Sequence, residues 1–138
     1  MELVVRNLDP ERDAMECVAP SGAVMTFDNP PEGRHGASPL EHLLASLGAC
    51  ALVDVGIVLR KKRLSFRNLR VTCTGERREK PYPRSFTSLK LRFEVEGDVP
   101  SAAFEEAVRL SVDKYCSVAG TIREAAPVAW EAAVTAPR

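Results

Sequence analysis

Residues 38–63 read SPLEHLLASLGACALVDVGIVLRKKR, the longest stretch of the chain with a helical spacing of apolar residues. It opens with Ser38-Pro-Leu-Glu41, a capping-box pattern in which the Ser and Glu side chains bond each other's backbone N–H groups. One face then carries Leu40, Leu43, Leu44, Leu47, Ala51, Val55 and Val58. The basic run at 60–63 suits the C-terminal end of a helix dipole. The stretch predicts a helix of about six turns.

Apolar residues also lie on the other sides of this predicted helix. Leu52, Val53, Ile57 and Leu59 fall outside the main face. A helix that is apolar around much of its circumference needs burial on every side, which a chain of 138 residues supplies with difficulty. The pattern therefore favours a homodimer that encloses the helix.

Alternating apolar and polar residues predict strands on both sides of the long helix. Before it, short alternating runs separated by Pro and Gly predict strands at 2–6, 14–18 and 23–27. After it, two longer runs at 65–78 and 87–96 predict an antiparallel hairpin with one buried face.

The C-terminal third predicts two further helices and a strand. Ser101 is the expected N-cap of an amphipathic helix lined by Phe104, Ala107, Val108, Leu110, Ser111 and Tyr115. A brief helical segment follows at 117–125, and a last strand at 128–134. Together these elements predict a single α+β domain over residues 1–138, with helices packed against antiparallel sheet.

The charge balance gives no reason to expect binding to nucleic acid or to an anionic membrane, because 19 basic residues offset 19 acidic ones. The first residues lack the apolar core of a signal peptide. The longest strongly apolar run, 49–59, contains Asp54 and is shorter than the roughly 20 residues that span a bilayer. We therefore expect a cytoplasmic protein whose cysteines are reduced.

The four cysteines form no CxxC pair and have no histidine at ligand spacing, so no zinc site is expected. Cys17 and Cys73 fall in strand-like runs, where a small thiol packs as a hydrophobe. Cys50 lies on the edge of the apolar face and, taken alone, would also be a core residue. Cys116 precedes Ser-Val-Ala-Gly, which can open a helix whose N-terminus would favour a thiolate.

The two histidines, His35 and His42, flank the start of the long helix. We expect both to be solvated residues without a chemical role.

Several short motifs together resemble the OsmC/Ohr family. The first is the helix start at 38–41 running into Leu-Leu-Ala-Ser-Leu-Gly-Ala-Cys at 43–50 and then Asp-Val at 54–55. Glu-Arg-Arg-Glu at 76–79, Pro-Arg-Ser-Phe-Thr at 83–87 and Lys-Tyr-Cys-Ser-Val-Ala at 114–119 are similar to the YhfA-like subgroup of that family. The resemblance covers roughly residues 38–134.

The resemblance implies an OsmC-like fold, an intertwined homodimer with two central helices side by side inside wrapped antiparallel sheets. The best-known branches are thiol-dependent peroxidases that reduce organic hydroperoxides, and hydrogen peroxide less well, in oxidative-stress defence. By position Cys50 would be the peroxidatic cysteine and Cys116 the resolving one. The expected reductant is an external dithiol such as a lipoyl group, with no metal, flavin or haem cofactor.

In the peroxidase branches an arginine oriented by a glutamate keeps the reactive thiol ionised. The glutamate corresponds to Glu41, which also has its capping role and lies more than two turns from Cys50. Those branches carry the arginine in a Gly-rich N-terminal turn, whereas the corresponding region here offers only Asp-Pro-Glu-Arg-Asp at 9–13, without a clear equivalent. Arg84, beside the Phe-Thr motif, and Arg34, before the helix, are the candidate substitutes.

Two other interpretations stay open. The chain could be a weakly active or non-enzymatic member that binds a hydrophobic ligand at the dimer interface. Alternatively, both Cys50 and Cys116 could be plain core residues.

Overall fold

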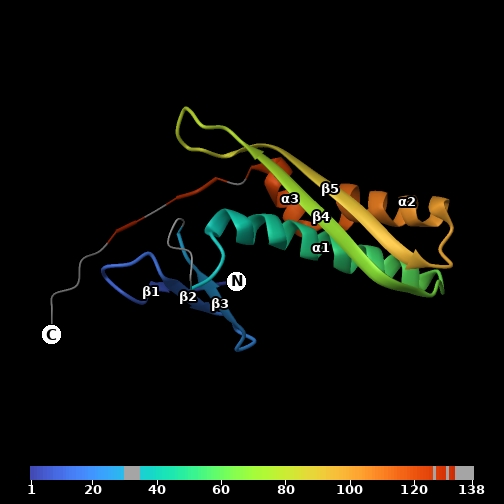
Figure 1. Cartoon of the computed structure of the whole chain (residues 1–138), viewed down its shortest axis with the longest axis horizontal. Coiled ribbons are helices and arrows are strands. Elements are labelled where there is room, and N and C mark those ends of the chain that lie inside the picture. Colours follow the sequence, from blue (N-terminus) through green and yellow to red (C-terminus); the bar gives the residue numbers. More distant parts are fainter. Residues whose placement is uncertain (30–34, 126, 130, 133–138) are drawn as a thin grey trace.

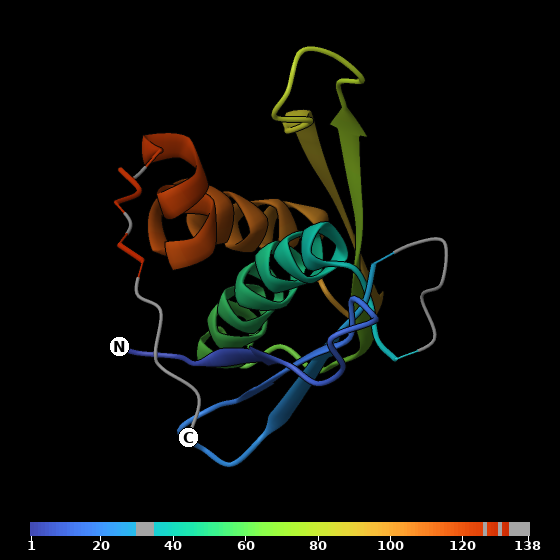
Figure 2. The ribbon, with the colours of Figure 1, turned by 90° about the vertical axis from the view of Figure 1, so that its left-hand side faces the viewer.

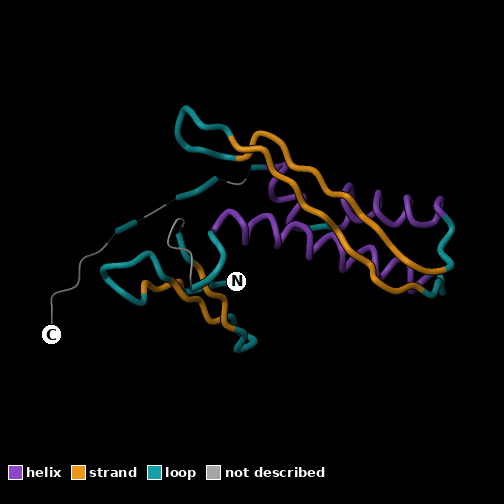
Figure 3. Tube along the Cα trace, viewed as in Figure 1, coloured by secondary structure: helices purple, strands orange, loops and turns teal. Residues whose placement is uncertain are grey.

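A computed structural model of the chain describes residues 1–29, 35–125, 127–129 and 131–132. Three short strands precede a long helix, which is followed by a long hairpin and two shorter helices (Figures 1 and 3). The elements are β1 (Val5–Asn7), β2 (Met15–Val18), β3 (Val24–Phe27), α1 (Pro39–Lys61), β4 (Phe66–Arg77), β5 (Phe86–Gly97), α2 (Ser101–Leu110), the π-helical turn η1 (Ser111–Tyr115) and α3 (Ser117–Glu124). The predicted α+β class is confirmed.

The start of α1 is fixed by its capping box. The Ser38 hydroxyl accepts a hydrogen bond from the Glu41 N–H at 3.3 Å, and the Glu41 carboxylate accepts one from the Ser38 N–H at 2.6 Å. Both orphan donors are therefore satisfied, as the sequence pattern predicts.

The buried stripe of α1 differs in part from the predicted one. Leu47, Ala51, Val55 and Leu59 are buried at intervals of four residues, whereas Leu43 is 41% exposed. Leu59 was expected to lie outside the stripe. The difference arises because α1 packs against β4, α2 and α3, and these elements cover the helix from its middle onward (Figures 1 and 2).

By length and apolar composition alone, α1 is also a helix that could cross a membrane. The core helix of a globular domain passes the same test, and α1 here packs against β4, α2, η1 and α3. The expectation that the chain has no membrane span stays a prediction.

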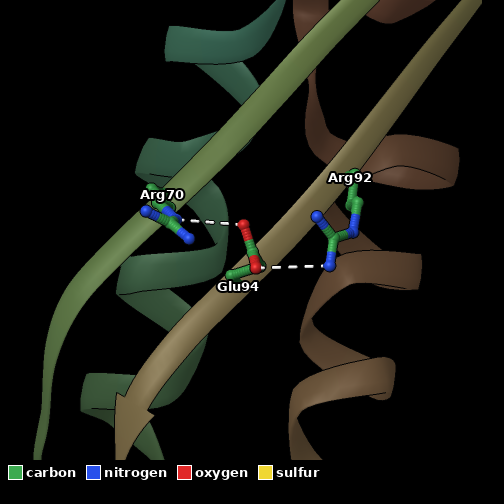
Figure 4. Close-up of polar contacts among 3 residues, drawn as sticks. All are labelled: Arg70, Arg92 and Glu94. Atoms are coloured by element: carbon green, nitrogen blue, oxygen red, sulfur yellow. Dashed lines mark hydrogen bonds and ion pairs between the residues drawn. The ribbon is translucent and has the colours of Figure 1, made fainter.

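The β4–β5 hairpin crosses over α1 and α2 as one antiparallel layer (Figure 1). Within it, Cys73 lies opposite Leu91. On its polar side, Glu94 accepts a hydrogen bond from Arg70 at 3.0 Å and forms an ion pair with Arg92 at 3.3 Å (Figure 4). Solvent-exposed ion pairs of this kind contribute little to stability, so the hairpin depends mainly on its apolar face.

A glycine lets α1 approach the hairpin closely. Gly48 is buried, and a Cβ atom at this position would collide with the sulfur of Cys73 and lie 3.2 Å from Val71 Cγ1. Any larger residue would therefore push the helix away from β4 just before Cys50.

The N-terminal strands form a separate antiparallel sheet in the order β1-β2-β3, on the other side of α1 from the hairpin (Figures 1 and 2). Cys17 is buried in this sheet. His42 joins the sheet to α1, because its Nε2 donates to the Thr26 carbonyl at 2.8 Å and its ring lies 4.1 Å from the ring of Phe27. The expectation of a solvated His42 was therefore wrong.

The second helix differs from the prediction at both ends. Pro100 occupies the N-cap position without a side-chain cap, so the prediction of Ser101 as N-cap was wrong; Ser101 is already the first helical residue. At its other end, α2 ends at Leu110 and the chain continues as the π-helical turn η1. The helix predicted to run through Tyr115 is thus interrupted by a π turn.

The brief helix predicted after Cys116 is α3, which confirms that part of the sequence reading. The last predicted strand, at 128–134, lies partly outside the described residues. Its described positions, 128–129 and 131–132, adopt no regular secondary structure.

Candidate functional site

Cys50 lies in the middle of α1 on the side that meets α3. It is partly exposed and packs against a small buried cluster made by Leu47, Ala51, Cys116 and Ala119. The capping box fixes where α1 begins and Gly48 fixes its distance from β4, so the position of Cys50 follows from local sequence features.

Cys116 is the N-cap residue of α3, at the point where the π turn ends. Its backbone N–H donates to the Ser111 carbonyl at 2.8 Å, and its sulfur accepts the Ala119 N–H at 3.4 Å. Ser111 is itself anchored to α1, because its buried hydroxyl donates to the Ala51 carbonyl at 2.8 Å. Turns of this type recur at functional sites, and here the turn brings Cys116 to α1.

The fold brings three reactive groups together at this point. The sulfurs of Cys50 and Cys116 and a carboxylate oxygen of Asp54 all lie within 4.8 Å of one another. Both cysteines are free thiols. Asp54 comes one helical turn after Cys50 and therefore faces the same side of α1.

In the sequence, Asp54 stands out only as a charged break in an apolar run. Its spacing of four residues from Cys50 was the available signal, because residues i and i+4 of a helix are neighbours.

Cys116 is the more protected of the two thiols, with only 3% of its surface exposed. Burial raises the pKa of Cys116 above that of an ordinary cysteine, and contact with Cys50 adds to the rise. The hydrogen bond from the Ala119 N–H opposes this shift. Cys116 is therefore held mainly as a neutral thiol beside the more accessible Cys50.

The other two cysteines lie elsewhere, Cys17 in the N-terminal sheet and Cys73 on β4 against Gly48. Burial also raises the pKa of Cys73.

Glu41 and Arg84 do not lie beside the thiols within one chain. Glu41 is engaged in the cap with Ser38, nine residues from Cys50 and thus about 14 Å along the axis. Arg84 is exposed in the β4–β5 connection, where its carbonyl accepts a hydrogen bond from Arg77. Across the described ranges, no hydrogen bond or ion pair joins the Arg84 side chain to Cys50 or Glu41. Arg34 lies outside the described residues.

An apolar groove of about 760 Å³ runs beside the thiol cluster, between β5, α2 and α3. Leu47 and Ala119 belong both to the groove wall and to the cluster that holds the cysteines. The rest of the apolar wall consists of Leu89, Leu91, Phe93, Phe104, Val108, Val112 and Ile122. Two arginines, Arg109 and Arg123, and two acidic residues, Glu105 and Asp113, complete the lining, so its formal charges balance. A mainly hydrophobic molecule would fit this surface.

A family model described as OsmC-like protein matches residues 31–131, most of the chain. The chain belongs to the OsmC-like protein family. This OsmC-like protein is 43% identical to protein YhfA of Escherichia coli (strain K12) over 94 residues, which cover 67% of this chain and 69% of YhfA. The resemblance drawn from the sequence motifs is thereby confirmed.

Solved structures agree with this assignment. The crystal structure of a hypothetical protein from Aquifex aeolicus VF5 has 31% identity and a TM-score of 0.77, and covers 91% of this chain and 89% of its own. The organic hydroperoxide resistance protein OhrB of Bacillus subtilis has 14% identity and a TM-score of 0.60, covering 91% and 93%. At that identity the likeness to OhrB shows the shared fold alone. The OsmC-like fold of the single chain is confirmed. The intertwined homodimer stays a prediction.

Proposed function

We propose that this OsmC-like protein is a thiol-dependent peroxidase that reduces organic hydroperoxides through Cys50 and Cys116. The observation that carries the proposal is the placement of two free thiols within 4.8 Å, one partly exposed and one buried. Organic hydroperoxide resistance proteins share this fold, and the proposal takes its reaction class from them.

In the first step the Cys50 thiolate attacks the terminal oxygen of the hydroperoxide. The O–O bond breaks, the alkoxide leaves as an alcohol after taking up a proton, and Cys50 becomes a sulfenic acid. Cys50 suits this step better than Cys116 because it is partly exposed, and because burial raises the pKa of Cys116. The groove beside the thiols would hold the organic part of the substrate.

In the second step Cys116 attacks the sulfenic sulfur, forming a disulfide and releasing water. An S–S bond is about 2.05 Å long, so the two sulfurs must approach from their separation in the reduced protein. An external dithiol, such as a lipoyl group, then restores both thiols by exchange and becomes a disulfide itself. No resident cofactor takes part in this cycle.

The proposed working form is a cytoplasmic homodimer. Three apolar residues of α1, Leu43, Val53 and Ile57, are 38–59% exposed in the single chain, which supports a second copy packed along this helix. Any activating role of Glu41 and Arg84 would come from that second copy, because neither contacts Cys50 within its own chain. Arg84→Ala should then lower kcat/KM, whereas Arg63→Ala, another exposed arginine, should not.

The proposal is tested by following consumption of cumene hydroperoxide with dihydrolipoamide as reductant. Cys50→Ser should abolish turnover, and Cys116→Ser should allow one turnover and then stall. Cys73→Ser serves as the matched control and should retain activity. Equal, slow rates in the wild type and all three variants would overturn the proposal.

The apolar groove favours one alternative, a binding protein for a hydrophobic ligand. In that case a fluorescent fatty acid or similar probe should bind equally well to the wild type and to Cys50→Ser, with no peroxide consumed by either. Leu91→Asp, which places a charge in the groove wall, should weaken binding of the probe.

A further inference from the structure

Asp54 has an unusual environment for a carboxylate. Its Oδ2 atom is buried, and no donor in the described parts of the chain makes a hydrogen bond to it. Leaving a buried polar atom unsatisfied costs about 1–3 kcal/mol, and more for a charged group. Such an atom in a folded protein indicates a partner that is not part of the chain, such as a water or an ion.

The groups around Asp54 narrow the choice of partner. Its carboxylate and the sulfurs of Cys50 and Cys116 lie mutually within 4.8 Å. Metal binding would ionise both thiols and so place three negative charges in this site, and no described lysine or arginine forms an ion pair with Asp54. Like charges this close are stable only with a cation between them.

Thiolate sulfur and carboxylate oxygen are both ligands of Zn²⁺ and related thiophilic ions. With Zn–S distances of about 2.3 Å and Zn–O distances of about 2.1 Å, the ligand atoms of a tetrahedral site lie roughly 3.5–3.8 Å apart. The side chains would need to close only slightly from their present separation. Cys50 is partly exposed, which gives an ion access and leaves room for water as a fourth ligand.

We infer that Cys50, Asp54 and Cys116 form a binding site for a thiophilic divalent cation of the Zn²⁺ class, with one coordination position open. Two residues come from neighbouring turns of α1 and the third is delivered by the N-cap of α3. The expectation that the chain has no zinc site rested on the linear spacing of Cys and His, which does not register ligands brought together by tertiary structure.

Binding displaces one proton from each thiol and occupies both sulfurs. A bound cation and a hydroperoxide therefore compete for the sulfur atoms of Cys50 and Cys116. If a hydroperoxide oxidises the loaded pair, the two thiolates and two protons yield a disulfide, an alcohol and water, and the cation is released. This coupling rests on the proposed function, whereas cation binding to the reduced protein does not.

The direct test is a titration of reduced, chelator-treated protein with Co²⁺, followed by competition with Zn²⁺. One Co²⁺ per chain should bind, with the intense visible bands of tetrahedral coordination and near-ultraviolet thiolate charge transfer. Cys50→Ser and Cys116→Ser should lose these signals. Asp54→Asn should weaken Co²⁺ binding at least about tenfold. Even residues that only hydrogen-bond to a metal ligand change metal affinity by about this factor when they are mutated.

Cys73→Ser is the matched control and should bind as the wild type does. Thermal unfolding in chelator checks that each variant is folded before titration. The inference is overturned if folded wild-type protein shows no tetrahedral Co²⁺ spectrum, or if Asp54→Asn binds Co²⁺ as tightly as the wild type.

The two proposals can fail separately. Peroxidase activity is measured on the metal-free protein, and cation binding is measured without peroxide. Inactive protein that binds Co²⁺ would overturn the proposed peroxidase alone. Active protein that does not bind Co²⁺ would overturn the cation site alone.

Discussion

The sulfur of Cys50, in the middle of α1, lies within 4.8 Å of the sulfur of Cys116, at the N-cap of α3. Two features maintain this relationship: the close approach of α1 to β4 at Gly48, and the π turn that ends at Cys116. The chemistry proposed for the pair therefore depends on packing contacts that can be altered one at a time.

The two thiols should differ in reactivity toward iodoacetamide. Cys50 should be alkylated faster than Cys116 near pH 7.5, because Cys116 is buried and burial raises its pKa. Raising the pH toward 9.5 should increase the Cys116 rate, because its raised pKa keeps the thiol mainly neutral near pH 7.5. Time-resolved peptide mass spectrometry measures both rates in one sample. Faster labelling of Cys116 near pH 7.5 would contradict the assignment of Cys50 as the attacking thiol.

Gly48→Ala should destabilise the fold by about 1–3 kcal/mol, because the new methyl group overlaps the sulfur of Cys73. Cys73→Ala should lower the free energy of unfolding by less in the Gly48→Ala variant than in the wild type. Urea unfolding of the four proteins in this double-mutant cycle measures the coupling.

Gly120→Ala in α3 is the control for that cycle, since no described atom beyond its chain neighbours and its own helix backbone lies within 4 Å of the added methyl group. It should be neutral or stabilising, by up to about 1 kcal/mol, because alanine favours helix. Strictly additive effects of Gly48→Ala and Cys73→Ala would show that α1 and β4 are not in the contact described.

Ser111→Ala should loosen the π turn, because the buried hydroxyl that donates to Ala51 is lost. We expect a loss of about 1–3 kcal/mol, and slower formation of the Cys50–Cys116 disulfide in the folded variant. Ser117→Ala, at an exposed position in the first turn of α3, is the control and should change neither quantity. An unchanged disulfide rate in Ser111→Ala would mean that the turn does not position Cys116.

The capping box should make part of the stability depend on pH. Hydrogen bonds from Ser38 lower the pKa of Glu41, so its carboxylate stabilises the fold above the ordinary glutamate pKa of about 4.3. That contribution is lost as the pH falls through the lowered pKa. Wild type should therefore be more stable than Glu41→Gln at pH 7, and the difference should vanish in acid. Glu79→Gln, at an exposed glutamate outside any helix cap, should show no such pattern.

Much of the fold could be predicted from the sequence because its signals are local. The Ser38–Glu41 pattern specifies the start of α1 through hydrogen bonds between residues three apart. Alternation along the hairpin strands specifies their apolar face. The first signal lies within one helical turn and the second within a single strand, so neither depends on the tertiary structure.

The features that the sequence reasoning missed are set by contacts between distant elements. The π turn depends on Ser111 reaching Ala51 on another helix. Burial of Leu59 instead of Leu43 depends on where α2 and the hairpin cover α1. Asp54 joins the thiols only because α3 brings Cys116 to the same side of α1. The motifs indicated which cysteines to pair but not the carboxylate between them.

The most direct test of the account is a single turnover of reduced, metal-free protein with one equivalent of cumene hydroperoxide, quenched at intervals and mapped by mass spectrometry. We predict a transient sulfenic acid on Cys50, trapped by dimedone in Cys116→Ser, followed in the wild type by a Cys50–Cys116 disulfide. Oxidation spread evenly over all four cysteines, or confined to Cys73 or Cys17, would contradict it.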